Sequence, residues 1–108
     1  MRARAIDARN TVAADVREQA ARVSDDVRRV RVYETTLVPQ ATTAYESVLN
    51  SYAAGRSSVA ELLLAERELI GLHDELYRAQ ADYGTHIARL ESVVGRAVRT
   101  KGPVDERR

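Results

Sequence analysis

Apolar residues recur every seven positions along two long stretches of the chain, and this repeat constrains the fold more than any other feature. In the first stretch, one series is Val16, Val23, Val30, Leu37 and Ala44, and an interleaved series is Ala13, Ala20, Val27, Ala41 and Val48, with Glu34 as its exception. In the second stretch, the two series are Leu62, Leu69, Leu76, Tyr83, Leu90 and Ala97, and Ala65, Leu72, Ala79, His86 and Val93. Gaps that alternate between three and four residues are typical of helices that meet along a heptad seam. The pattern therefore predicts two long helices.

A third apolar row lies beside the seam of the second stretch and consists of Leu63, Ile70 and Tyr77. It makes the apolar face of this helix wider than one seam requires. We therefore expect the second helix to have more than one neighbour.

The two stretches are separated by one short break around Gly55. Glycine suits the left-handed position just past a helix end, because it has no Cβ. Ser58 suits the N-cap of the next helix, and Glu61 completes a capping box. A connection this short makes the two helices antiparallel. We predict an all-α, long antiparallel two-helix coiled-coil hairpin over residues 1–99, with helices at about 4–54 and 58–98, a turn at about 55–57 and a frayed tail at 100–108.

Pro39 interrupts the first helical pattern. A proline removes one backbone hydrogen bond, here the bond to the Thr35 carbonyl, and crowds the preceding turn. We expect a kink or a brief break near residues 35–39, with the hydroxyls of Thr35 and Thr36 available to freed backbone groups. Gly95 is either an early C-cap or a residue inside the second helix.

The composition excludes several classes of function. The chain has no Cys, which excludes disulfide scaffolds and thiolate chemistry. Its 17 basic and 16 acidic residues give a net charge of +1, and neither half forms a surface for nucleic acid. No segment is apolar enough for a membrane-spanning helix, and the N-terminus has no secretory signal.

The sequence contains no pattern typical of an active site. His73 and His86 lie about 20 Å apart along one helix and cannot share a metal. The side chains of the adjacent acids Asp25 and Asp26 diverge around the helix. No phosphate-binding loop, nucleophile elbow or metal-ligand spacing is present. We therefore expect no catalytic residue, no cofactor and no metal.

The break and the residues after it carry a more specific signal. The segment from Tyr52 to Leu63 follows the pattern Tyr-x-x-Gly-x-x-Ser/Thr-apolar-x-acid-apolar-Leu. This pattern resembles the periplasmic tip of TolC-type outer-membrane efflux proteins. The resemblance extends upstream through the stretch Leu37-Val38-Pro39-Gln40-Ala41 and downstream to Leu90 and Gly95, and it covers about residues 5–95.

The resemblance implies a part in transport across the outer membrane. Members of this family conduct exported substrates through a trimeric α-helical barrel, which docks at its periplasmic tip to an adaptor protein and an inner-membrane pump. They carry two hairpin repeats, barrel strands and an export signal, whereas this chain matches one hairpin, the C-terminal repeat. We therefore interpret it as a partial family member, located in the outer membrane with a periplasmic extension, that forms a homo-oligomer and touches the membrane only through barrel strands absent from this chain.

The same resemblance singles out residues at the tip as candidates for partner docking or gating. These are Tyr52, Gly55, Arg56, Ser57 and Ser58. Some relatives have an Arg two residues after the tip glycine, where it helps to hold the tunnel closed. This chain has Ser57 at that position and Arg56 one residue earlier. The resemblance therefore does not imply that this hairpin makes the polar contact that holds the tunnel closed.

Two other interpretations stay open. The chain fits a generic antiparallel coiled-coil module or the hairpin of a periplasmic adaptor, although adaptor tips follow a different Arg-x-x-x-Leu pattern. A remote alternative is a small all-helical enzyme of the chorismate-mutase type, because Arg4-Ala5-Ile6-Asp7 resembles the first helix of that family. The cationic cluster that binds a dicarboxylate in such enzymes is not traceable in this sequence.

Overall fold

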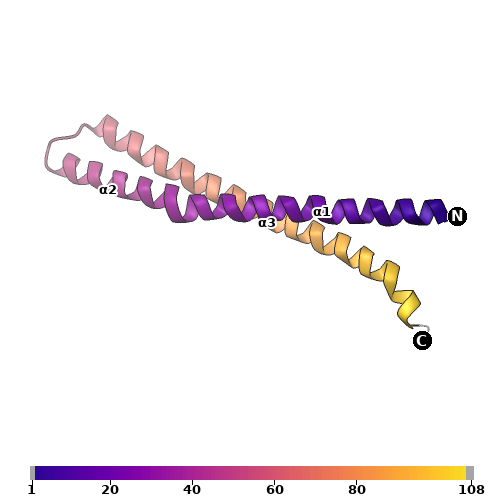
Figure 1. Cartoon of the computed structure of the whole chain (residues 1–108). Coiled ribbons are helices and arrows are strands. Elements are labelled where there is room, and N and C mark those ends of the chain that lie inside the picture. Colours follow the sequence, from indigo (N-terminus) through magenta and orange to yellow (C-terminus); the bar gives the residue numbers. More distant parts are fainter. Residues whose placement is uncertain (1, 107–108) are drawn as a thin grey trace. The chain divides into compact units, whose positions relative to one another are not determined.

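The computed structural model describes the backbone of residues 2–106 and the side chains of residues 3–99. It contains helix α1 (Arg2–Val32), a π-helical turn η1 (Tyr33–Leu37), helix α2 (Val38–Ala53) and helix α3 (Val59–Glu106) (Figure 1). The described residues form no strand. The predicted all-α fold, with one turn between two long helical runs, is confirmed.

The chain divides into two units. The turn unit, Val27–Ala81, contains the end of α1, the π turn, α2, the connecting turn and the first part of α3. Within it, α2 and α3 run antiparallel on either side of the turn (Figure 1). The terminal unit consists of Met1–Asp26 and Asp82–Arg108. It pairs the rest of α1 with the rest of α3.

The buried face of α3 follows the predicted heptad pattern. The residues withdrawn from solvent on this helix include Leu62, Ala65, Leu69, Leu72, Leu76, Ala79, His86, Leu90, Val93 and Ala97. Ala79 is completely buried in the turn unit, and Val93 is only 5% exposed in the terminal unit. Tyr83 is the exception in the predicted series, because 38% of it is exposed. Small and branched residues at these positions are typical of helices that interlock along a seam.

On the buried face of the first helical run, one of the two predicted series is correct and the other is shifted by one position. The series Val16, Val23, Val30 and Leu37 is partly buried as predicted, and so are Ala41 and Val48. The interleaved positions are instead Val12, Gln19 and Asp26 in α1 and Tyr33 at the start of the π turn. The prediction was therefore wrong for Ala13, Ala20 and Val27, which are exposed. After the π turn, Tyr45 is partly buried in place of the predicted Ala44.

The π turn explains this change of register. A π turn accommodates one more residue than an α-helical turn, as the bond from the Val38 N–H to the Tyr33 carbonyl shows. The interleaved series therefore advances by eight residues from Tyr33 to Ala41 instead of seven. Glu34, the exception in the predicted series, is exposed because Tyr33 takes the seam position.

Pro39 distorts the helix without breaking it. Val32, Leu37 and Val38 all keep right-handed helical dihedral angles, so the helical run continues through the π turn. The Thr35 hydroxyl donates to the Arg31 carbonyl at 2.6 Å. Thr11 and Thr42 make the same bond to the carbonyl four residues back, so this bond is not specific to the distortion. The predicted disturbance near residues 35–39 is therefore a π turn at 33–37, which ends two residues before the proline.

Helix α3 continues beyond its predicted end. It reaches Glu106 instead of residue 98, and residues 107–108 of the predicted frayed tail lie outside the described part. A glycine ends a helix when it adopts a positive φ. Among the described residues only Gly55 has one, and Gly95 lies inside α3, so Gly95 does not end the helix.

Candidate functional site: the hairpin turn

The turn between α2 and α3 is closed by three backbone hydrogen bonds that return to the end of α2. The Gly55 N–H donates to the Tyr52 carbonyl at 3.0 Å, and the Arg56 N–H donates to the Ser51 carbonyl at 2.7 Å. The Ser57 N–H also donates to the Ser51 carbonyl, at 3.3 Å. Gly55 has a φ of 75°, which confirms the predicted left-handed glycine. This arrangement is a Schellman motif, which satisfies the last carbonyl groups of a helix.

Ser58 begins the second helix as predicted. Its hydroxyl oxygen accepts a hydrogen bond from the Glu61 N–H at 3.1 Å, which is the bond of an N-cap. Within the described residues, the Glu61 carboxylate makes no return bond to the Ser58 N–H, so half of the predicted capping box forms. The chain therefore reverses between two capped helix ends.

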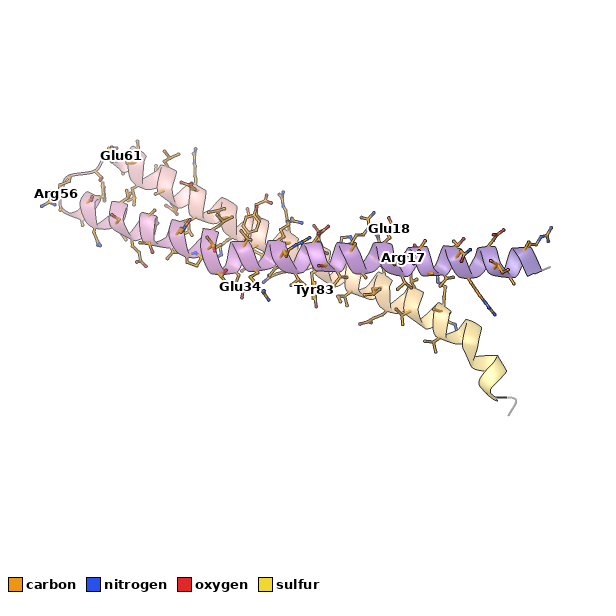
Figure 2. All side chains as sticks on the ribbon, viewed as in Figure 1. Arg17, Glu18, Glu34, Arg56, Glu61 and Tyr83 are labelled. Carbon is orange, nitrogen blue, oxygen red and sulfur yellow. The ribbon has the colours of Figure 1, made fainter. Side chains whose placement is uncertain are left out.

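The turn presents side chains to solvent rather than backbone amides. The amides of Gly55, Arg56 and Ser57 are already bonded to α2. Arg56 is exposed at the end of the turn (Figure 2), and 42% of Tyr52 is exposed. Ser57 is partly buried. A partner that reaches this turn can therefore bind the Arg56 guanidinium and the Tyr52 side chain.

Replacement of Ser58 by alanine tests the geometry of the turn. Ser58→Ala removes the oxygen that accepts from the Glu61 N–H, and we expect the free energy of unfolding to fall by about 1 kcal/mol. Ser57→Ala is the matched control, because the Ser57 hydroxyl makes no hydrogen bond within the described residues. Thermal or urea denaturation followed by circular dichroism measures both. Equal stability of the two variants would contradict the N-cap role of Ser58.

A polar pair in the seam of the terminal unit is the second notable site. The Asp26 carboxylate and the His86 ring lie 2.5 Å apart, measured from Oδ2 to Nδ1, and their side chains are 8% and 18% exposed. The sequence pattern places His86 in the seam, but it assigns the opposite position to Val27 and so misses Asp26. In the same unit, Arg96 donates to Asp15 at 3.3 Å. These two contacts fix one antiparallel register in the terminal unit.

One polar atom in the same seam has no partner. The Gln19 Oε1 atom is buried and accepts no hydrogen bond within the described residues. A buried acceptor without a donor costs about 1–3 kcal/mol. Gln19 precedes Asp26 by seven residues, so both belong to the one heptad series that the π turn brings into the seam.

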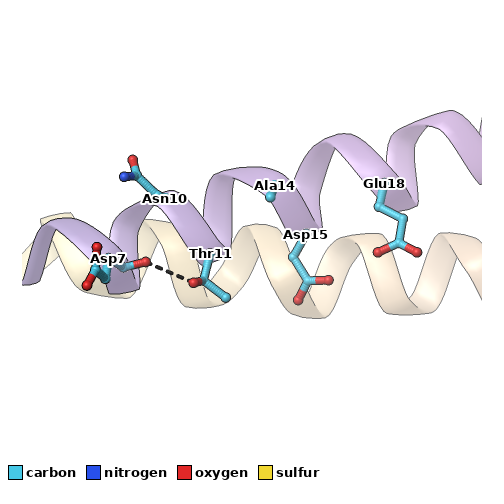
Figure 3. A pocket seen from close by; sticks show the side chains of 6 residues that line it. All are labelled: Asp7, Asn10, Thr11, Ala14, Asp15 and Glu18. Carbon is cyan, nitrogen blue, oxygen red and sulfur yellow. Dashed lines mark hydrogen bonds between the residues drawn. The ribbon is translucent and has the colours of Figure 1, made fainter. Parts of the chain in front are cut away.

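An open depression on α1 has acidic walls. It is lined by Asp7, Asn10, Thr11, Ala14, Asp15 and Glu18, and the Thr11 hydroxyl donates to the Asp7 carbonyl at 2.8 Å (Figure 3). Asp15 is the residue bonded to Arg96. The described residues contain no group of three or more His, Asp or Glu side chains that could hold a metal ion. The depression is therefore a gap between side chains of one helix face.

Comparison with known proteins gives no match: no family model, no curated protein and no solved structure is significantly similar to this chain. Within its described part, no helix is both long and apolar enough to cross a membrane.

Proposed function

We propose that the chain supplies one periplasmic helical hairpin of a TolC-type outer-membrane efflux channel. The observation that carries the proposal is the turn: the Tyr52–Leu63 sequence pattern coincides with a tight reversal between two long helices, with Gly55 left-handed and Ser58 as the N-cap. In this role the hairpin forms part of the wall of a trimeric tunnel. Its turn lies at the periplasmic mouth, where an adaptor protein and an inner-membrane pump dock.

The surface of α3 supports a role in a larger assembly. Leu63, Ile70 and Tyr77 lie outside the seam and are 51%, 52% and 67% exposed. They repeat every seven residues on one side of the helix, all within the turn unit. A heptad row of exposed apolar side chains is typical of a helix that packs against a further helix. Neighbouring hairpins of the same tunnel would cover this row.

Self-association of the isolated chain tests the lateral contact. We expect the mass measured by sedimentation to rise with concentration, because association removes the exposed Ile70 row from water. Ile70→Glu is expected to shift the chain toward monomer. Glu68→Arg, which changes an exposed charge on the other side of α3, serves as the control. A chain that stays monomeric from micromolar to millimolar concentration would contradict the lateral contact.

Photo-cross-linking in cells tests docking at the turn. A photoreactive amino acid replaces Arg56 in the full-length protein, and the same substitution at the exposed Arg17 on α1 is the control. We expect an adduct from position 56, identified by mass spectrometry as a periplasmic adaptor protein, and none from position 17. If position 56 gives no adaptor adduct at normal protein abundance, the hairpin is a coiled-coil module of another kind.

A further inference from the structure

An apolar line runs along the exposed side of α3 within the turn unit. Four of its side chains are between 51% and 67% exposed, namely Val59, Leu63, Ile70 and Tyr77. At about 100° per residue, these four and the exposed Ala81 fall within about 20° of one direction around the helix. At about 1.5 Å per residue, the apolar line is about 33 Å long. A second helix can therefore lie along it.

Four polar side chains flank the apolar line, two on each side. Glu66 and His73 lie about 40–60° to one side of it, and Arg67 and Asp74 lie equally far to the other side. All four are exposed. Each side therefore carries one acidic and one basic group seven residues apart, and the order of acid and base along the helix is opposite on the two sides.

These four flanking side chains make no hydrogen bond or ion pair among the described residues. The partners available within one helix are the residues three or four positions away. For three of the four, every such residue is uncharged. The exception is Asp74, whose neighbour Arg78 bonds to Glu75 at 3.5 Å instead. The flanking groups are therefore available to a second molecule.

The surface is complementary to itself. When a second α3 runs antiparallel with Ile70 opposite Ile70, each side of the apolar line meets the same side of the other copy in reverse order. Arg67 then stands within about 1.5 Å, along the axis, of the level of Asp74 of the second copy, and Glu66 stands equally close to the level of His73. The two-fold symmetry of such a pair forms each contact twice. Acid therefore meets base at four places around one apolar strip.

The sizes of the apolar side chains favour the antiparallel direction. The charges alone also fit a parallel second copy, because the two different sides then meet and again place acid beside base. A parallel pair, however, places Tyr77 on Tyr77 at one end and Leu63 on Leu63 at the other, so the helices are held further apart at one end. The antiparallel pair places Tyr77 against Leu63 at both ends and Val59 against Ala81 outside them. Large side chains that face smaller ones give layers of even width.

We propose that α3 recognises a second copy of itself along the apolar line, in an antiparallel pair centred on Ile70. The flanking acids and bases select this partner, and burial of the apolar side chains drives the association. The turns of the two copies point in opposite directions, so the pair differs from the lateral contact of hairpins whose turns share one mouth. It covers the apolar line in chains outside such a tunnel, and the proposal does not rest on the efflux channel.

Exchange of two flanking charges tests the pairing. Arg67→Asp and Asp74→Arg each bring like charges together at two places, and we expect each to raise the dissociation constant of the dimer about tenfold. The double change exchanges the two charges and is expected to restore the original constant in an antiparallel pair. In a parallel pair it would bring each new charge beside a like charge of the opposite side and weaken the dimer further.

Sedimentation equilibrium measures these constants, and circular dichroism shows that each variant keeps its helix. Glu68→Arg, which reverses an exposed charge on the opposite side of α3, is the control and is expected to leave the constant unchanged. Single changes that act no more strongly than Glu68→Arg, or a double change that fails to restore the original constant, would contradict the proposal.

A mixture of two single-cysteine chains reports the direction, because the chain has no cysteine of its own. Leu63→Cys and Tyr77→Cys chains are mixed in equal amounts above the dissociation constant and oxidised. A disulfide needs two Cβ atoms that approach closely, and the antiparallel pair brings position 63 to position 77 of the other copy. We therefore expect the mixed dimer, identified by its mass, to exceed the share given by random pairing. Homodimers in excess, a random share of mixed dimer, or no disulfide dimer would overturn the proposal.

Discussion

Replacement of Ala79 by aspartate is expected to unfold the turn unit. Ala79 is 0% exposed and lies on the seam face of α3. A carboxylate at this position would be buried without a partner, and an uncompensated buried charge costs about 3–5 kcal/mol. That cost is comparable to the lower end of the whole stability of a small domain, about 5 kcal/mol. Circular dichroism should show a large loss of helix at room temperature.

The matched control is Ala81→Asp, two residues further along the same helix. Ala81 is exposed, so a carboxylate there stays in water. Exposed substitutions usually change the free energy of unfolding by less than about 0.5 kcal/mol. The two variants have the same composition and differ only in which side of α3 carries the charge. Equal helix content in both would mean that Ala79 does not lie in a seam.

The path of α3 could be predicted from the sequence because its signals agree with one another. Leucine and alanine repeat in both series, Ser58 caps the first turn, and Gly55 is placed just before it. Each of these local preferences favours the same helix that begins after Ser58, so this helix can be predicted without knowledge of its tertiary contacts. The end of α3 was not predictable, because Gly95 permits a helix end without requiring one.

One of the two seam series of α1 could not be predicted, because the apolar residues Ala13, Ala20 and Val27 each stand one position after the residue that enters the seam. The prediction joined Val27 to Ala41 as though the helix were regular between them. The π turn adds one residue before Pro39 and brings in Asp26 instead. The only signals of the π turn in the sequence are Pro39 and the interruption of the apolar series at Glu34. Neither signal shows that one extra residue enters the turn or that the seam positions before it shift by one.

The role of the turn is harder to deduce than its geometry. A Schellman motif followed by an N-cap reverses any helical chain, so the bonds at Gly55 and Ser58 serve folding whatever the protein does. Arg56 is different, because its exposed side chain takes no part in these bonds. A test of function must therefore change Arg56 and leave the turn intact.

Reversal of the charge at position 56 is expected to impair transport without unfolding the hairpin. Arg56→Glu keeps the Arg56 N–H, which bonds to the Ser51 carbonyl, and changes only an exposed side chain. The free energy of unfolding should change by less than about 0.5 kcal/mol. In the proposed role at the periplasmic mouth, Arg56 would meet an acidic group of the adaptor or of a neighbouring hairpin, and the change would place a negative charge there. Like charges that face each other across an interface weaken binding, so docking or closure should be lost.

The measurement that tests the proposed function most directly is transport in cells that produce the full-length protein with and without Arg56→Glu. Substrate export and passive antibiotic entry are compared at equal protein abundance, with Arg17→Glu on the exposed side of α1 as the control. A role at the periplasmic mouth predicts that Arg56→Glu lowers export or raises antibiotic entry, while Arg17→Glu does neither. Normal export together with normal impermeability in the Arg56→Glu cells would contradict it, and Arg56 would then be a solvated residue of a turn that only reverses the chain.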